Sequence, residues 1–68
     1  MDYKELKKMT KGKQFPLAGR TAKNEPVIIE QGETDNGHFF KLTIAQDNNW
    51  CRIVTFWANG DAEETFKK

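Results

Sequence analysis

The connections between the apolar segments of this chain are very short, and this limits its fold more than any other feature. Residues 38–46 and 50–58 are both rich in β-branched and aromatic side chains, and only residues 47–49 separate them. A parallel crossover needs a dozen or more residues, whereas a tight turn can join two antiparallel strands. The chain is therefore predicted to form an antiparallel sheet.

Four segments have the composition of strands, and they cover residues 14–22, 26–31, 38–46 and 50–58. Asn36-Gly37, between the second and third segments, is a strong hairpin signal. The shape predicted from this order is mostly β, a small antiparallel barrel or half-barrel with short terminal helices.

The two ends of the chain are predicted to be helical. Residues 1–13 read as a basic N-terminal helix or arm with Tyr3 and Leu6 on one side, and residues 14–68 as the β domain. Near the C-terminus, Asp61 is a candidate N-cap followed by acidic residues in the first turn, which favours a second helix.

Size and cysteine content narrow the class of protein. A chain of 68 residues makes one domain with a small core. Its single cysteine, Cys51, cannot form an internal disulfide, which fits a reducing, cytoplasmic location. No apolar run approaches the length of a membrane span and no signal-peptide pattern is visible, so a soluble protein is predicted.

The charge is unevenly distributed along the chain. Residues 1–23 carry seven Lys or Arg against two Asp or Glu, a net charge of +5, while residues 24–47 carry one against five, a net charge of −4. This asymmetry favours an anionic partner for the first third. The candidate contacts there are Lys11, Lys13, Arg20 and Lys23. The alternative is a basic tail that is merely solvated.

The segment 50–58 has aromatic residues on both of its sides. Cys51, Ile53, Thr55 and Trp57 share one side, which is predicted to face the core. The other side holds Trp50, Arg52, Val54 and Phe56. The preceding strand repeats the mixture of aromatic ring, cation and hydroxyl in Phe39, Lys41 and Thr43, so one shared surface is predicted.

Flat rings for stacking and cations for phosphates suit unstacked nucleic-acid bases. The alternative is a sheet that is buried on both sides, with one side covered by a partner chain or by the N-terminal helix.

An ordered set of residues in this region resembles a known family. The set consists of Trp50, Arg52, Ile53, Val54, Phe56, Ala62 and Glu63. It is similar to the third strand and following helix of the bacterial and phage single-stranded-DNA-binding proteins, whose domain is an OB-fold. Leu42, Ile44 and Ala45 resemble the end of that family's second strand, and Gly19 and Pro26 its first turn. The resemblance covers about residues 16–68.

The resemblance implies an OB-like β domain that binds single strands without catalysis. Trp50 and Phe56 would stack on bases, and Arg52 would contact the backbone. The chain departs from the family in three ways: Arg20 replaces the usual Asn, the long hairpin is reduced to residues 47–49, and the last two strands are missing. By this resemblance, the chain is expected to be a relative of the family that is truncated after the third strand and the helix. Its open edge favours a homo-oligomer.

The predicted function is binding of single-stranded DNA, or of RNA by the same chemistry, in phage or mobile-element replication or recombination. The alternative is a small phage-type protein-interaction module or inhibitor that uses the same aromatic patch on a host protein. No catalytic, cofactor, metal or small-molecule site is predicted, because His38 and Cys51 are the only residues of their types.

Overall fold

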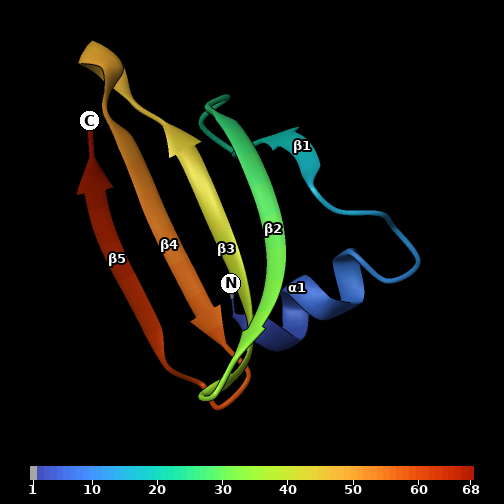
Figure 1. Ribbon diagram of the computed structural model, residues 1–68. Helices are drawn as coiled ribbons and strands as arrows, with labels where there is room; N and C mark the ends of the chain where they lie inside the picture. Colours follow the sequence, from blue (N-terminus) through green and yellow to red (C-terminus); the bar gives the residue numbers. More distant parts are fainter. Residues whose placement is uncertain (1) are drawn as a thin grey trace.

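Five antiparallel strands and one short helix make up the part of the chain that the computed structural model describes, residues 2–68. The elements are α1 (Tyr3–Met9), β1 (Leu17–Arg20), β2 (Pro26–Thr34), β3 (Gly37–Ala45), the 3-10 turn η1 (Asp47–Asn49), β4 (Cys51–Trp57) and β5 (Ala62–Lys67). The strands form one sheet in the order β1-β2-β3-β4-β5 (Figure 1). The predicted mostly β, antiparallel fold is confirmed. The sheet is open, which is compatible with an OB-like half-barrel.

The β2–β3 hairpin forms where the sequence predicts it. Thr34 pairs with Gly37 across a two-residue turn of Asp35 and Asn36. Gly37 has a φ of 107°, a conformation that glycine adopts without steric cost. This turn fixes the register between β2 and β3, and so decides which residues of the two strands share a face.

The predicted C-terminal helix is wrong, because residues 62–67 form β5. This strand pairs with β4 along its length, from Phe56 opposite Ala62 to Cys51 opposite Lys67. Asn59-Gly60 makes the turn, and the Trp57 N–H donates to the Asp61 carbonyl at 2.8 Å. Asp61 therefore belongs to a hairpin rather than to a helix cap.

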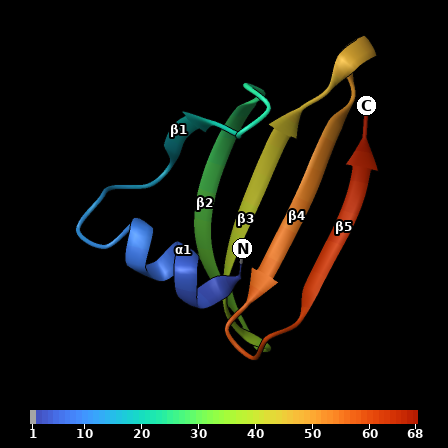
Figure 2. The ribbon, with the colours of Figure 1, turned by 180° about the vertical axis from the view of Figure 1, so that it is seen from behind.

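The short helix α1 belongs to the core. The Asp2 carboxylate caps it by accepting a hydrogen bond from the Glu5 N–H at 3.0 Å. At the other end, the Thr10 hydroxyl donates to the Leu6 carbonyl at 2.7 Å. Leu6 itself is only 1% exposed, and Figure 2 shows α1 beside the sheet. Burial of Leu6 thus attaches the basic N-terminal segment to the sheet.

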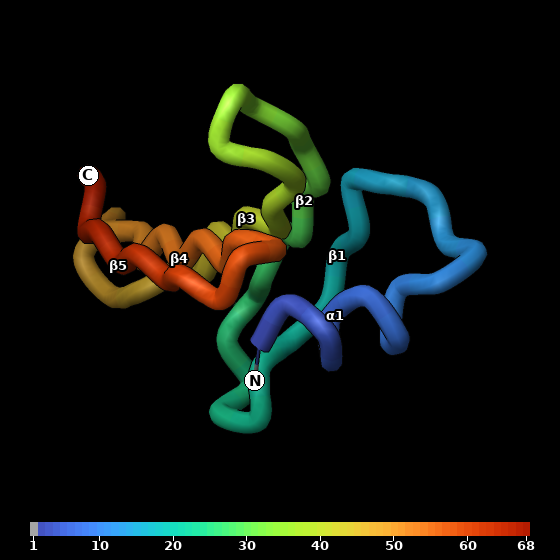
Figure 3. The backbone as a smooth tube through the Cα atoms, turned by 90° about the horizontal axis from the view of Figure 1, so that it is seen from below, coloured from blue at the N-terminus to red at the C-terminus, as the bar shows by residue number. Residues whose placement is uncertain are grey.

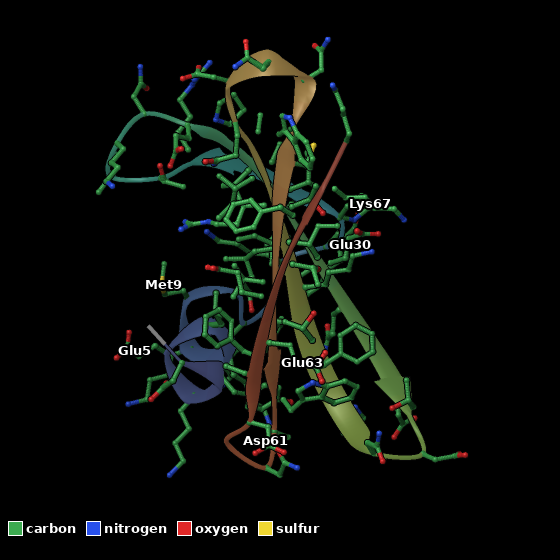
Figure 4. The ribbon with its side chains drawn as sticks, turned by 90° about the vertical axis from the view of Figure 1, so that its left-hand side faces the viewer. Glu5, Met9, Glu30, Asp61, Glu63 and Lys67 are labelled. Carbon is green, nitrogen blue, oxygen red and sulfur yellow. The ribbon has the colours of Figure 1, made fainter. Side chains whose placement is uncertain are left out.

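The sheet has one face toward α1 and one that no described element covers. We call the first the helix-side face; its central positions are Val27, Ile29, Phe40, Leu42, Ile44, Arg52, Val54, Phe56, Glu64 and Phe66. The second is the open face, with Ile28, Glu30, Phe39, Lys41, Thr43, Ile53, Thr55, Trp57, Glu63, Thr65 and Lys67. In Figure 4, Met9 of α1 lies on one side of the sheet, and Glu30 and Lys67 lie on the other.

The buried core lies between α1 and the helix-side face. It consists of Leu6, Val27, Phe40, Leu42 and Ile44. The rings of Tyr3 and Phe15 close over Phe40, with ring centroids 5.0 and 5.9 Å from that of Phe40. α1 packs against β3, and Figure 3 shows it toward the β1 end of the sheet, with β5 at the other end. The helix therefore covers only part of its face, and the part formed by β4 and β5 stays accessible.

The predicted orientation of β4 is wrong. Val54 pairs with Leu42 and Phe56 with Phe40, so Val54 and Phe56 pack against the core. Trp57 pairs with Phe39 and therefore lies on the open face. Both sides of β4 are half-buried, so its apolar pattern does not show which side faces the core. The pairing with β3, whose alternation is clear, decides it.

Candidate nucleic-acid interface

Five lysines gather around one hollow on the helix-side face, which we call the lysine pocket. Its volume is about 570 Å³. The lining lysines are Lys4, Lys7, Lys8, Lys11 and Lys13, and the other lining residues are Thr10, Gly12, Phe15, Gln31 and Phe40. Three of the lysines come from α1, and the other two from the loop that follows it. The pocket thus combines five cationic side chains with two aromatic ones, Phe15 and Phe40, in its lining.

Within residues 2–68, no salt bridge offsets the positive charge of the lysine pocket. No carboxylate lines it, and none of its lysines makes a salt bridge with another residue in 2–68. Like charges crowded on a short segment repel one another, so the free energy of the free protein rises. An anion that fits the hollow would relieve this repulsion. Lys11 and Lys13, predicted from sequence to contact an anionic partner, are two of the five.

A second hollow of about 570 Å³ lies on the same face, and we call it the apolar groove. Leu6 and Met9 of α1 form one wall, and core and near-core residues of the sheet form the floor. The polar groups along it are Arg20, Thr21, Arg52 and Glu64. Two guanidinium groups beside an apolar floor suit a ligand that is flat and apolar in one part and anionic in another.

Arg52 has an incompletely satisfied guanidinium group. Its Nη1 lies 3.8 Å from the Glu64 carboxylate, which is a long and weak ion pair between partly exposed groups. Its Nε is buried and has no hydrogen-bond acceptor among residues 2–68. Arg20, at another part of the groove, donates from Nη1 to the Asn24 carbonyl at 3.0 Å. Both arginines retain donors for a further anionic group.

Two exposed aromatic rings extend the apolar groove toward the edge of the sheet. Trp50 precedes β4 with extended backbone, so the alternation of the strand places it on the same side as Arg52. Trp50 is 41% exposed, and the Lys68 ammonium lies 5.6 Å from its ring centroid. Phe66, opposite Arg52 on β5, is 57% exposed. Both rings have an accessible face for stacking.

Phe66 is absent from the site predicted from sequence, because the sequence predicts a helix after the candidate N-cap Asp61. Asn59-Gly60 is the same dipeptide signal that correctly locates the β2–β3 turn. Applied at this second position, it predicts a hairpin, and strand alternation then puts Phe66 beside Arg52. The acidic pair Glu63-Glu64 favoured the helix instead.

The structure divides the predicted site residues between two faces. Trp50 and Arg52 lie together on the helix-side face, and Lys11 and Lys13 line the lysine pocket on that face. Arg20 lines the apolar groove, but its pairing with Pro26 gives it the strand parity of the open face. Phe39, Lys41 and Thr43 lie on the open face, so the single shared surface predicted from sequence is wrong. Phe56 is half-buried against the core, which reduces the ring area available for stacking. Lys23 lies in the β1–β2 turn, in neither hollow.

The open face has its own aromatic pair. The Phe39 and Trp57 rings lie with centroids 5.0 Å apart. Phe39 also lies across Gly32, where an added Cβ would approach the Phe39 Cζ to 2.5 Å. Glycine at this position therefore permits the Phe39 ring to lie flat on the sheet next to Trp57. Ile28, on the same face, is 42% exposed.

Two kinds of site are not found in residues 2–68. No group of three or more His, Cys, Asp or Glu side chains is arranged to hold a metal ion. In the same residues, no helix has the length and apolarity required to cross a membrane.

The resemblance to single-stranded-DNA-binding proteins stays a prediction made from sequence. Its third-strand residues Trp50 and Arg52 lie on one face, but the segment matched to the following helix is β5. Comparison of the chain with protein-family models, curated proteins and solved structures finds no match.

Proposed function

We propose that this protein binds single-stranded nucleic acid, without catalysis, on its helix-side face. The observation that carries the proposal is the lysine pocket, which is lined by five lysines and two phenylalanines, and none of these lysines makes a salt bridge with another residue in 2–68. On the same face, Trp50 and Phe66 supply exposed rings, and Arg52 supplies a guanidinium group whose ion pair with Glu64 is long, at 3.8 Å. Lysines that hold phosphates and rings that stack on bases are the two components of sequence-tolerant single-strand binding.

The proposed path of the strand follows from the positions of these groups. The sugar–phosphate backbone contacts the lysine pocket, and bases enter the apolar groove and stack on Trp50 and Phe66. Arg20 and Arg52 neutralise phosphates along the groove.

The proposed ligand is single-stranded DNA or RNA, because phosphate contacts and base stacking are common to both and only a contact to the 2′-hydroxyl would distinguish them. A cytoplasmic location belongs to the proposal, in keeping with the single unpaired cysteine. Phage or mobile-element replication or recombination is its proposed setting.

Binding to oligo-dT is expected to weaken linearly with the logarithm of salt concentration. Each phosphate contact contributes about 0.7 to the slope on single strands, so the five pocket lysines contribute up to about 3.5. Fluorescence anisotropy of a labelled oligo-dT at several salt concentrations measures the slope. An oligomer of the same sequence with an uncharged methylphosphonate backbone is the control, and its binding should be weak and insensitive to salt. A slope near zero for oligo-dT would contradict the proposal.

The open face supports a second candidate function, a protein-interaction module. Phe39 and Trp57 form an aromatic pair there, and no element within residues 2–68 covers it. An apolar protein interface depends little on salt, whereas phosphate binding depends on it steeply. The salt titration therefore separates the two functions. Lysines concentrated around a hollow on the opposite face favour the nucleic-acid function.

A further inference from the structure

The outer edge of β5 is a strand edge that no other strand within residues 2–68 pairs with. All six residues of β5 are exposed, and β4 pairs with only one side of it. The opposite edge of the sheet, β1, has four residues. An exposed edge presents a row of free N–H and C=O groups that can template pairing with another strand. β5 is therefore the better candidate for adding a strand.

The hydrogen-bond pattern of the β4–β5 hairpin shows which residues direct their backbone groups outward. The Trp57 N–H donates to Asp61, so these two residues form a hydrogen-bonded pair. Hydrogen-bonded and non-hydrogen-bonded pairs alternate along an antiparallel ladder. Thr65 and its neighbours of the same parity therefore bond inward to β4. The N–H and C=O groups of Ala62, Glu64 and Phe66 point to the free edge.

We propose that β5 pairs antiparallel with β5 of a second copy of this chain, in a register centred on Thr65. A two-fold axis perpendicular to the sheet then places Thr65 opposite the partner's Thr65. It also places Glu63 opposite the partner's Lys67, and Lys67 opposite the partner's Glu63. The outward groups of Glu64 and Phe66 bond to the partner's Phe66 and Glu64. Opposite charges directly across a strand pair are stabilising.

The side-chain sequence of β5 disfavours the neighbouring registers. A register centred on Glu64 places that carboxylate opposite its own copy, and like charges directly opposite are destabilising. In a register centred on Phe66, only residues 65–67 of β5 lie opposite residues of the partner's β5, so fewer backbone hydrogen bonds can form. Charges on an edge strand usually oppose pairing. In the register centred on Thr65, they form two complementary pairs instead.

This pairing joins two copies of the proposed binding site, a consequence that rests on the proposed function. Because the axis is perpendicular to the sheet, both helix-side faces lie on the same side of a continuous ten-stranded sheet, five strands from each copy. Phe66 is next to the axis, Arg52 lies opposite Phe66 on β4, and Trp50 lies close to Lys68. The aromatic rings and guanidinium groups of the two copies then form one strip across the axis, with a lysine pocket at each side.

Disulfide trapping tests the register directly, in a chain that carries Cys51→Ser to remove the native thiol. Thr65→Cys places two thiols at a non-hydrogen-bonded pair, where the Cα atoms are about 4.5 Å apart, within disulfide range. This variant is expected to give a covalent dimer in an oxidising glutathione buffer at tens of micromolar protein. Glu63→Cys is the matched control, because its two thiols would be four residues out of register, about 13 Å apart along the strands. Equal cross-linking of both variants, or of neither, would overturn the proposal.

Sedimentation equilibrium provides a second test that needs no cysteine. The unsubstituted chain is expected to dimerise, and Glu63→Lys to raise the dimer dissociation constant about tenfold, because two attractive pairs become repulsive. The double variant Glu63→Lys with Lys67→Glu restores the opposite charges and is expected to restore the dimer. A monomeric unsubstituted chain, or a double variant as weak as the single one, would contradict the register. Neither test contains nucleic acid, so its result is independent of the proposed function.

Discussion

Replacing Phe40 by alanine is expected to cost about 3–5 kcal/mol of folding free energy. Phe40 is 1% exposed, and the rings of Tyr3 and Phe15 pack on it, so its removal leaves a cavity between α1 and the sheet. A chain of this size has about 3–10 kcal/mol of total stability. Phe40→Ala should therefore lose about a third or more of its stability, which urea denaturation followed by circular dichroism would show as a lower unfolding midpoint.

The matched control is Trp57→Ala, which removes a larger ring from the other face of the sheet. Trp57 is half-buried, and its main ring contact is Phe39. We expect this variant to stay folded, with a clearly smaller loss of stability than Phe40→Ala. If Trp57→Ala unfolds the chain while Phe40→Ala is tolerated, the two faces of the sheet have been assigned the wrong way round.

Neutralising Lys11 and Lys13 to glutamine is expected to reduce the salt slope of oligo-dT binding by about 1.4, since each lost phosphate contact removes about 0.7. At physiological salt this corresponds to a loss of affinity of about tenfold. Both lysines line the lysine pocket, and neither makes a salt bridge within residues 2–68, so the fold should not depend on their charge.

A second pair of lysines provides a control with the same change in net charge. Lys23 lies in the β1–β2 turn, and Lys41 lies on the open face, so neither lines the lysine pocket or the apolar groove. Neutralising Lys23 and Lys41 to glutamine should leave the salt slope nearly unchanged. Equal effects of the two double variants would show that only net charge matters, and would remove the lysine pocket from the proposed interface.

The β3 strand and the β2–β3 hairpin could be predicted from the sequence because each has a local signal. Phe40, Leu42 and Ile44 alternate with more polar residues, and all three are buried. Asn36-Gly37 fixes the turn. Short connections between apolar segments predict antiparallel pairing for steric reasons, whatever the details of packing.

The orientation of β4 could not be predicted from its own residues. Ile53 and Trp57 on one side are as apolar as Val54 and Phe56 on the other, so local pattern does not distinguish the sides. The decision comes from the β3–β4 register, in which Leu42 lies beside Val54. Register depends on contacts between strands, and a slip of one residue reverses every side chain.

The candidate interface depends on the same non-local information. Lys11 and Lys13 were identified from charge alone, but the pocket exists only because burial of Leu6 holds α1 against the sheet. Phe66 joins Arg52 only because residues 62–67 form a strand. The acidic residues at the start of this segment favour a helix locally, and pairing with β4 outweighs that preference.

The two tryptophans allow the central claim, that the helix-side face binds the strand, to be measured directly. Trp57→Phe leaves Trp50 on the helix-side face as the only tryptophan, and Trp50→Phe leaves Trp57 on the open face. Both substitutions keep an aromatic ring, so both variants should fold and bind.

Oligo-dT is titrated into each variant while tryptophan emission is recorded, and anisotropy of a labelled strand confirms binding. We predict quenching of Trp50 in the Trp57→Phe variant, because a base stacks on its ring. Emission of Trp57 in the Trp50→Phe variant should stay constant. Quenching confined to Trp57, with binding intact, would place the nucleic acid on the open face and contradict this account.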